Sequence, residues 1–288
     1  MIKQKIYRNL IFDVGFHKGE DTAYYLYKGF NVIAIDADIS LIENGKVRFY
    51  KEIENGRLRF LNRVITEDDN KPVTFNISEN SQWSSIYKEI SQRENMKSYE
   101  IKIESARLDT LFKKYGVPYY CKIDIEGNDI VALKTLSSLI DLPIYISVET
   151  ECCYDYEIAE IKKLDTLNYL YKLGYRKFKL VDQYTLTVLS NQDFYIDTRN
   201  MSSIDKYKLY FKDSHTYAKK LLDSSIRKDG KQKFNDIFKG SSGPFGKDLA
   251  GKWFDYNGAK ELLLKHRKAN SIIMDKPYGF WCDWHATF

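Results

Sequence analysis

Acidic and glycine residues follow the first apolar run of the chain, residues 10–14. The residues of this turn that could contact a ligand are Asp13, Gly15, Phe16, His17, Gly19 and Thr22. The next apolar run, residues 32–35, leads into Asp36 and Ala37. When two such strands pair in a doubly wound sheet, their carboxyl ends lie side by side at the ligand crevice. Asp36 is then placed to accept hydrogen bonds from both ribose hydroxyls of a nucleoside.

The spacing of the glycines distinguishes between classes of nucleotide. Gly15 and Gly19 form G-x-x-x-G, which differs from the G-x-G-x-x-G of dinucleotide folds. Asp13 would also place a carboxylate where a pyrophosphate lies, which disfavours NAD. S-adenosylmethionine suits this turn, because its tail carries an ammonium and a sulfonium that a nearby carboxylate attracts. The alternative is an ordinary turn between a strand and a helix, with incidental glycines.

A second group of charged residues lies in residues 121–127, Cys-Lys-Ile-Asp-Ile-Glu-Gly. The two-residue period of a strand would put Lys122, Asp124 and Glu126 on one face. A central parallel strand is normally apolar on both faces, so three charges there need partners or a ligand. We therefore expect a ligand site at its carboxyl end. The competing interpretation is a buried ion pair between Lys122 and Asp124, with Glu126 capping the next helix.

The elements that position these residues follow from the alternation of β-branched runs with helical periods. This alternation predicts an α/β protein with a doubly wound, mostly parallel sheet. The expected core strands are residues 10–14, 32–35, 58–65, 119–125, 144–148 and 175–181. The expected helices are residues 21–28, 39–49, 108–115, a period after Gly127, and residues 158–173. Residues 73–77 and 99–104 are expected to form a local pair of strands.

The alternation ends after Val181, which predicts a division of the chain into three parts. Residues 1–182 form the nucleotide-binding core. Residues 183–277, with a helix at 259–267, form an insertion that serves as a lid and acceptor site. Residues 278–288 alternate aromatic with small or polar residues, which favours a final strand that returns to the core.

These segments together resemble the FkbM-type methyltransferases over residues 8–182. The resemblance rests on the turn from Asp13 to Thr22, the strand ending at Asp36, and the segments 105–111, 122–127 and 146–149. The K-I-D-x-E-G of residues 122–127 is its most specific part. Phe16 and His17 stand where family members usually have Ala and Asn. Residues 240–246 and 280–286 also resemble the ending of a subgroup.

The resemblance implies a class I, Rossmann-like fold with a seven-stranded sheet whose last strand is antiparallel. It implies S-adenosylmethionine as the cofactor and S-adenosylhomocysteine as its product. The expected reaction is O-methylation of a hydroxyl on a sugar or glycan-like small molecule. Surface polysaccharide or secondary metabolite biosynthesis would use such a product.

The resemblance also suggests which residues hold the ligands. The expected cofactor contacts are Asp13, Gly15, Phe16, His17, Gly19, Thr22, Asp36, Ala37, Val64, Trp83, Ser84 and Asp124. Val64 would lie at the adenine edge, and Trp83 could stack on adenine or on a sugar. Both residues could equally belong to the core. The expected acceptor contacts are Ser241, Ser242, Phe245, Trp253 and Asp283.

Methyl transfer to oxygen needs an aligned acceptor and a general base that removes the hydroxyl proton. The candidate bases are Asp124, Glu126, His17, Glu149 and His285, and we favour a carboxylate from residues 121–127. A divalent cation held by Asp124, Glu149 and Asp283 is another way to acidify the hydroxyl. No spacing in the sequence requires a metal.

The composition narrows the classes of partner. The 288 residues are 43% hydrophobic and 30% charged, with a net charge of +5, which excludes a disordered chain. Residues 199–239 hold 11 Lys and Arg against 5 Asp, so the basic charge belongs to the expected insertion. Such a segment either attracts a phosphorylated or acidic acceptor or forms a solvated surface.

Two rival functions and the location of the protein also follow from the sequence. A nucleic-acid methyltransferase is disfavoured, because the segment after the fourth strand lacks the Asp/Asn-Pro-Pro-Tyr/Phe typical of that class. A non-catalytic protein that binds the cofactor is the other rival. The start of the chain shows no secretory signal, and no apolar run approaches the roughly 20 residues that cross a bilayer. This predicts a cytoplasmic protein with four reduced cysteines, and no pattern indicates an oligomeric state.

Overall fold

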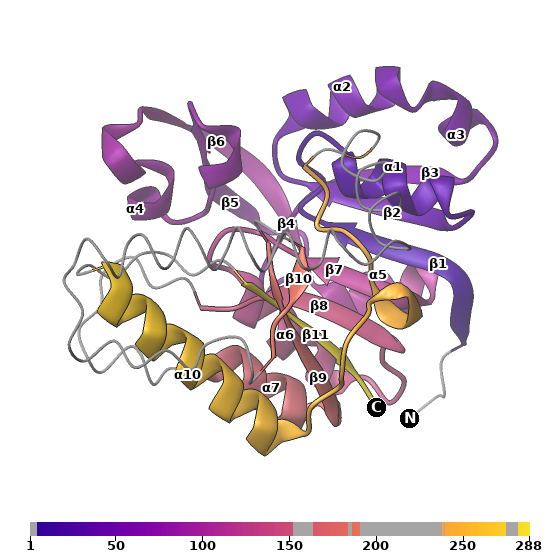
Figure 1. The fold of residues 1–288 in the computed structure, drawn as a ribbon. Helices are drawn as coiled ribbons and strands as arrows, with labels where there is room; N and C mark the ends of the chain where they lie inside the picture. Colours follow the sequence, from indigo (N-terminus) through magenta and orange to yellow (C-terminus); the bar gives the residue numbers. More distant parts are fainter. Residues whose placement is uncertain (1–4, 152–163, 184–185, 191–237, 239, 275–281) are drawn as a thin grey trace.

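The centre of the fold is an eight-stranded sheet in the order β10-β9-β11-β8-β7-β1-β2-β3 (Figure 1). The computed structural model describes residues 5–151, 164–183, 186–190, 238, 240–274 and 282–288. The strands are β1 (Ile6–Val14), β2 (Asn31–Asp36), β3 (Leu58–Asn62), β7 (Val117–Ile123), β8 (Tyr145–Glu149), β9 (Lys177–Asp182), β10 (Thr187–Val188) and β11 (Cys282–Thr287). The five strands β3, β2, β1, β7 and β8 lie next to one another in this order and are parallel. The strand β11 is antiparallel to β8 and β9. The predicted doubly wound sheet with an antiparallel final strand is confirmed, and the short β10 adds an edge.

Helices cover both faces of this sheet. One face packs against α5 (Leu108–Tyr115), α6 (Asp129–Thr135), α7 (Asp165–Lys172) and α10 (Tyr256–Met274). The other face packs against α1 (Glu20–Tyr27) and α2 (Ile39–Arg48), and α3 (Tyr50–Glu54) follows α2. In β1, Phe12 and Val14 face the first layer, whereas Ile11 faces the second. This alternation explains why the buried part of β1 is apolar on both faces, with Asp13 as the exception.

The order of the strands creates a crevice. The chain adds β2 and β3 on one side of β1, and it then adds β7 and β8 on the other side. Helices on opposite faces of the sheet therefore diverge at the carboxyl ends of β1, β2 and β7. Ligands bind at this switch point in open α/β sheets.

The predicted third strand, residues 58–65, is wrong in its length. β3 ends at Asn62, whose side-chain amide donates to the carbonyls of Asp36 and Ala37, both at 3.0 Å. The chain then leaves the main sheet. β4 (Val64–Ile65) pairs with β6 (Ser98–Ala106), and β6 pairs with β5 (Pro72–Ser78) in a separate three-stranded sheet. Figure 1 shows β5, β6 and α4 (Lys88–Ser91) as a lobe above the main sheet. The short 3-10 helices are η1 (Ser81–Trp83), η2 (Arg93–Asn95), η3 (Leu136–Ser138) and η5 (Gly246–Asp248).

Described parts of residues 183–277 belong to the core rather than to a detached layer. β10 extends the sheet, and Phe254 pairs with Phe178 of β9. The ring of Phe245 stacks on Tyr120 of β7 with centroids 4.2 Å apart. The expected helix at 259–267 is the centre of α10, which packs on β9 and α7. Hydrophobic packing therefore continues past the boundary expected at residue 182.

Several expectations from the sequence concern residues outside the described ranges. The start of the helix expected at 158–173, the Lys-rich segment 199–239 except Phe238, and residues 278–281 lie outside the described residues. The cysteines Cys152 and Cys153 do so as well, while Cys121 and Cys282 are buried. None of the helices in the described part of the chain combines the length and apolar character that crossing a membrane requires.

Candidate active site

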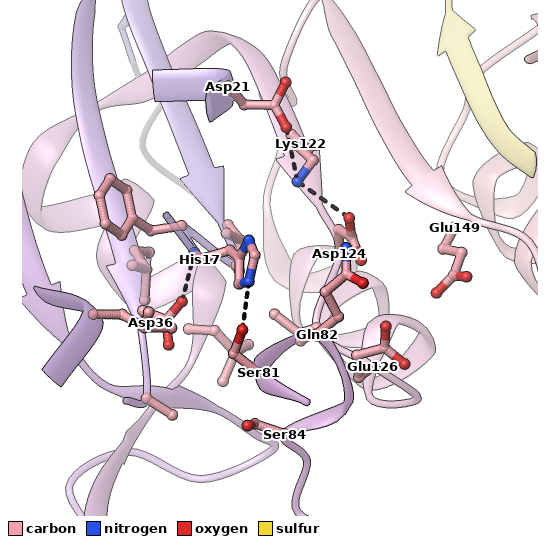
Figure 2. Close-up of a pocket in the computed structure, with 18 of the residues that line it drawn as sticks. His17, Asp21, Asp36, Ser81, Gln82, Ser84, Lys122, Asp124, Glu126 and Glu149 are labelled. Carbon is pink, nitrogen blue, oxygen red and sulfur yellow. Dashed lines mark hydrogen bonds and ion pairs between the residues drawn. The ribbon is translucent and has the colours of Figure 1, made fainter. Parts of the chain in front are cut away.

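A cavity lies at the carboxyl ends of β1, β2 and β7 (Figure 2). Its free volume is about 1320 Å³, counted out to the open mouth. Because this volume includes solvent at the mouth, the residues that line the cavity indicate its ligand better than its size does.

The wall of the cavity contains most of the predicted cofactor residues. The predicted residues that line it are Gly15, Phe16, His17, Asp36, Ala37, Val64, Trp83, Ser84, Asp124, Glu126, Glu149, Ser241 and Ser242. They come from segments far apart in the sequence, including the turn after β1, the η1 segment and the loop after β7. The fold thus brings together the residues that the sequence analysis assigned to one site.

The turn after β1 depends on Gly15. Its φ angle is +93°, and a Cβ atom there would lie 1.8 Å from the carbonyl oxygen of Asp124. The amides of Gly15 and Phe16 both donate to the carbonyl of Ile35, at 2.9 and 3.0 Å. Only a residue without a side chain can bring this turn so close to the loop after β7.

Asp36 is held at the end of β2 by two backbone amides. Its Oδ2 accepts from the His17 amide and its Oδ1 from the Asp38 amide, both at 2.8 Å. Burial raises the pKa of Asp36 to about 6, although these two hydrogen bonds act in the opposite direction. Ligand hydroxyls that donate to this carboxylate would stabilise its ionised form.

His17 links the turn after β1 to the η1 segment. Its Nε2 lies 2.8 Å from Ser81 Oγ, and its Nδ1 lies 3.6 Å from a carboxylate oxygen of Glu20 (Figure 2). Ser81 and Gln82 line the same cavity. The His17–Ser81 hydrogen bond therefore joins two segments of the cavity wall.

Lys122 lies between two carboxylates (Figure 2). Its Nζ is 3.1 Å from Asp21 Oδ2 and 3.2 Å from Asp124 Oδ2. Burial alone would lower the pKa of Lys122, but the charges of Asp124, Asp21 and Asp13 together raise it well above its usual value. The ion pair between Lys122 and Asp124, which was the competing interpretation, is present. It lies in the wall of the cavity, so it does not exclude a ligand site.

Three carboxylates converge beside this ion pair. Oxygen atoms of Asp124, Glu126 and Glu149 lie within 4.8 Å of one another. Glu126 also contacts Arg93 at 3.3 Å. Burial, followed by the charge of Asp124, raises the pKa of Glu126 to about 8. The pKa of Glu149 is raised well above its usual value by burial and then by the charge of Glu126.

The backbone carries these carboxylates in a way that the sequence did not predict. β7 ends at Ile123 rather than at residue 125, and Glu126 has a φ angle of +48°. The carboxylate of Asp129 accepts from the amides of Ile125 and Gly127, both at 3.2 Å. The predicted strand alternation is therefore wrong at Glu126, and a turn capped by Asp129 presents it instead.

The cluster also differs from the cation site considered in the sequence. The residues that could share a cation are Asp124, Glu126 and Glu149, whereas Asp283 is outside this group. Asp283 accepts from Gln183 Nε2 at 2.6 Å, and burial raises its pKa to about 8. A cation at this point would therefore use Glu126 in place of Asp283.

Seven predicted site residues do not line the cavity. Asp13 is fully buried and accepts from Thr22 Oγ1 at 2.6 Å beneath the turn. Gly19 lies against the rings of Phe16 and Phe49. The remaining four are Phe245, Trp253, Asp283 and His285.

The contacts of these four residues explain why they do not line the cavity. Phe245 fills the space between Tyr25 and Tyr120, and Trp253 stacks on Tyr145. Burial, followed by the charge of Lys179, lowers the pKa of His285 to about 3. The imidazole of His285 is therefore a weak base, and His285 does not line the cavity, so this structure does not present it as the catalytic base.

Some lining residues had no assigned role in the sequence analysis. They include Glu20, Asp21, Arg63, Ser81, Gln82, Lys122, Asn128 and Gln183. Ser81 and Gln82 belong to the serine-rich segment that drew attention to Trp83. Lys122 was noticed as a charge in a strand. Asp21 and Gln183 carried no signal, because only the folded chain brings them beside β7.

The sheet order and the crevice together define a Rossmann-like fold with a ligand site at its switch point. The family model described as the methyltransferase FkbM domain matches residues 13–177. The chain belongs to the FkbM methyltransferase family, and it is an S-adenosylmethionine-dependent methyltransferase. The resemblance found in the sequence is thereby confirmed.

The solved structures that are similar to the chain have low identities and low TM-scores. No curated protein matches the chain. The precorrin-6y C5,15-methyltransferase of Geobacter metallireducens GS-15 is 11% identical, with 60% of this chain and 66% of that chain covered and a TM-score of 0.31. The MccD protein is 12% identical, with 100% and 92% covered and a TM-score of 0.35. Phosphoethanolamine N-methyltransferase 2 of Haemonchus contortus, in complex with S-adenosyl-L-methionine, is 10% identical, with 100% and 49% covered and a TM-score of 0.35.

Proposed function

We propose that this methyltransferase acts on a hydroxyl of a sugar or glycan-like small molecule, with Asp124 as the general base. The observation that carries this proposal is the position of Asp124. Its carboxylate lines the cavity, pairs with Lys122 at 3.2 Å, and lies beside Glu126 and Glu149. Surface polysaccharide or secondary metabolite biosynthesis would use such a reaction.

The residues of one half of the cavity fit S-adenosylmethionine. Asp36 is a half-buried carboxylate whose pKa burial raises, and it would accept from the ribose hydroxyls. Val64, Trp83 and Ser84 would surround the adenine. The backbone of the turn at Gly15 would lie along the rest of the cofactor. The bound cofactor supplies a methyl group on a positively charged sulfur, and the carboxylates of the cavity favour such a charge.

The residues of the other half fit a hydroxylated acceptor. Glu20, Gln183, Ser241 and Ser242 line this half with groups that donate or accept hydrogen bonds. Such groups match the hydroxyls of a sugar better than an apolar molecule, because an unpaired buried polar group is costly. The described wall also carries more carboxylates than cations, which supports a neutral acceptor over a phosphorylated one.

Asp124 is the best base among the three carboxylates. Burial raises the pKa of Glu126 to about 8, so Glu126 holds its proton near pH 7, and burial also raises the pKa of Glu149 above its usual value. Asp124 is the member of the cluster that pairs with a lysine. Asp124 would accept the hydroxyl proton of the acceptor as its oxygen takes the methyl group that the sulfonium of S-adenosylmethionine would release. Alignment of the hydroxyl by the cavity wall supplies much of the rate enhancement.

The test has two stages. Calorimetry with S-adenosylmethionine and S-adenosylhomocysteine measures cofactor binding, and radiolabelled cofactor then reports transfer to nucleotide sugars and polysaccharide fragments. The variant Asp124→Asn should bind the cofactor normally and lose roughly 10²–10⁴ of the transfer rate. Full turnover by this variant would remove Asp124 as the base. Labelling of RNA with a steep salt dependence, and of no saccharide, would favour a nucleic-acid substrate.

A further inference from the structure

Asp21 makes an unusual number of contacts for a residue in the first turn of a helix. Its Oδ1 accepts from Ser241 Oγ at 2.6 Å and from the Ser242 amide at 2.9 Å. Its Oδ2 accepts from Ser242 Oγ at 3.0 Å and lies 3.1 Å from Lys122 Nζ. Asp21 is only 6% exposed, so these partners replace water almost entirely.

The partners of Asp21 come from two distant parts of the chain. Ser241 and Ser242 lie in the C-terminal segment that lines the acceptor half of the cavity, 220 and 221 positions from Asp21. Ser241 Oγ also accepts from the Gly243 amide at 3.1 Å, which fixes the bend of this segment. The Asp21 carboxylate therefore fixes Ser241 and Ser242 against the first turn of α1, beside the packing of Phe245 on Tyr25.

The same carboxylate acts on Asp124 through Lys122. The ammonium of Lys122 is buried between Asp21 and Asp124, at 3.1 and 3.2 Å (Figure 2). A buried ammonium that loses one of its counter-charges moves toward the other or recruits water. A change in the contacts of Asp21 must therefore change the position of Lys122, and with it the position of the Asp124 carboxylate.

We propose that Asp21 is a positioning residue that couples the seating of Ser241 and Ser242 to the orientation of Asp124. The serine contacts orient the Asp21 carboxylate. This carboxylate fixes the position of the Lys122 ammonium, which in turn fixes the position of the Asp124 carboxylate. When Ser241 and Ser242 are bound to Asp21, they form their part of the acceptor half of the cavity, and Asp124 is oriented as the base at the same time. This inference rests on the proposed function in one respect, namely that Asp124 is the base.

The first experiment needs no acceptor. The protein is labelled with ¹³C at the aspartate carboxyl carbons, and the signal of Asp124 is the one missing from Asp124→Asn. The signal should shift in Asp21→Asn, which replaces the oxygen facing Lys122 with an amide that cannot accept. It should also shift in the double variant Ser241→Ala/Ser242→Ala, which leaves Asp21 and Lys122 in place. An unchanged Asp124 signal in the double variant would overturn the coupling, even if Asp21→Asn did not fold.

The matched control is Asp109→Asn. Asp109 is 2% exposed and accepts from Ser138 Oγ at 2.6 Å and Lys113 Nζ at 2.8 Å, so its surroundings resemble those of Asp21. It does not line the cavity. The Asp124 signal should not move in this variant, and a shift as large as that of Asp21→Asn would mean that any loss of a buried aspartate has this effect.

The second experiment uses the saccharide that is labelled most strongly in the screen. Asp21→Asn should lower kcat by about tenfold to a hundredfold, because a small misplacement of a catalytic group has an effect of this size. The KM for S-adenosylmethionine should stay within about twofold. In an Asp124→Asn background, Asp21→Asn should cause no further loss, whereas an additive loss would contradict the inference. If Asp124→Asn alone keeps full turnover, the assignment of the base fails, and the carboxyl signal still decides the coupling.

Discussion

Gly15 lies against the backbone of Asp124, and a Cβ atom at Gly15 would meet the Asp124 carbonyl oxygen at 1.8 Å. The amide of Asp124 also donates to the carbonyl of Val14 at 2.9 Å. The turn that leads into the cofactor half and the loop that carries the proposed base are therefore in direct backbone contact. Either one can move only if the other moves.

Gly15→Ala should separate these two segments. The change adds a clash with backbone at a φ angle of +93°, so we expect a loss of about 2–4 kcal/mol in the free energy of unfolding and a large loss of cofactor affinity. Gly29→Ala is the control, because Gly29 has a φ angle of +90° and open space around it. Urea denaturation should show a loss of only about 1 kcal/mol for the control. Equal losses in the two variants would mean that the contact with Asp124 has no effect.

Asp36→Asn should weaken cofactor binding selectively. The neutral amide keeps the shape of the side chain and loses charge-assisted hydrogen bonds to the ribose, so the Kd for S-adenosylhomocysteine should rise about tenfold to a hundredfold. Calorimetry measures this change. Asp38→Asn is the control, since Asp38 is 6% exposed, caps α2 through Ser40 and does not line the cavity. Similar losses in both variants would argue against a ribose contact at Asp36.

The stability of the unliganded protein should fall as the pH rises. The pKa of Glu126 is raised from 4.5 to about 8, so the folded state keeps a proton that the unfolded state has already released. The stabilisation is complete below about pH 4.5 and is lost as the pH approaches 8. Urea denaturation across this range should show a shallower decline for Glu126→Gln. The exposed Glu43→Gln should follow the unmodified protein, and an identical decline in Glu126→Gln would contradict the raised pKa.

Methyl transfer should not depend on a divalent cation. Lys122 and Arg93 already place positive charges 3.2 and 3.3 Å from Asp124 and Glu126, where a metal would otherwise supply them. Transfer to the saccharide found in the screen should therefore stay within about twofold after treatment with EDTA. Loss of transfer that Mg²⁺ or Mn²⁺ restores would show instead that Asp124, Glu126 and Glu149 hold a metal.

The parts of the fold that the sequence predicted are those governed by local patterns. Apolar runs and helical periods located the core strands and the helix Leu108–Tyr115, because each buries a face with its own periodicity. The split between β3 and β4 was missed, since it depends on hydrogen bonds from Asn62 to the end of another strand. Long-range contacts of this kind leave no period in the sequence.

The candidate site also contains residues that local patterns predicted and residues whose role depends on long-range contacts. Asp36, Gly15 and Asp124 were predicted because they follow strands, and parallel strands bring their carboxyl ends together. Asp21 was missed because its role comes from two serines far along the chain. His285 and Trp253 were assigned to the site by residue type, but His285 is buried in the sheet and Trp253 stacks on Tyr145. Residue type alone does not tell which side of a packed layer a side chain occupies.

The insertion of β11 between β8 and β9 bears on how the protein folds. Asp283 of β11 and Gln183, just after β9, are 100 positions apart and yet hydrogen-bonded. Until β11 is in place, β8 and β9 each present an unpaired edge, and such edges attract other chains. The sheet can therefore be completed only after a long stretch of chain has been synthesised. Folding intermediates of this protein should be prone to aggregate, and a chaperone that shields the open edges should raise the yield of native enzyme.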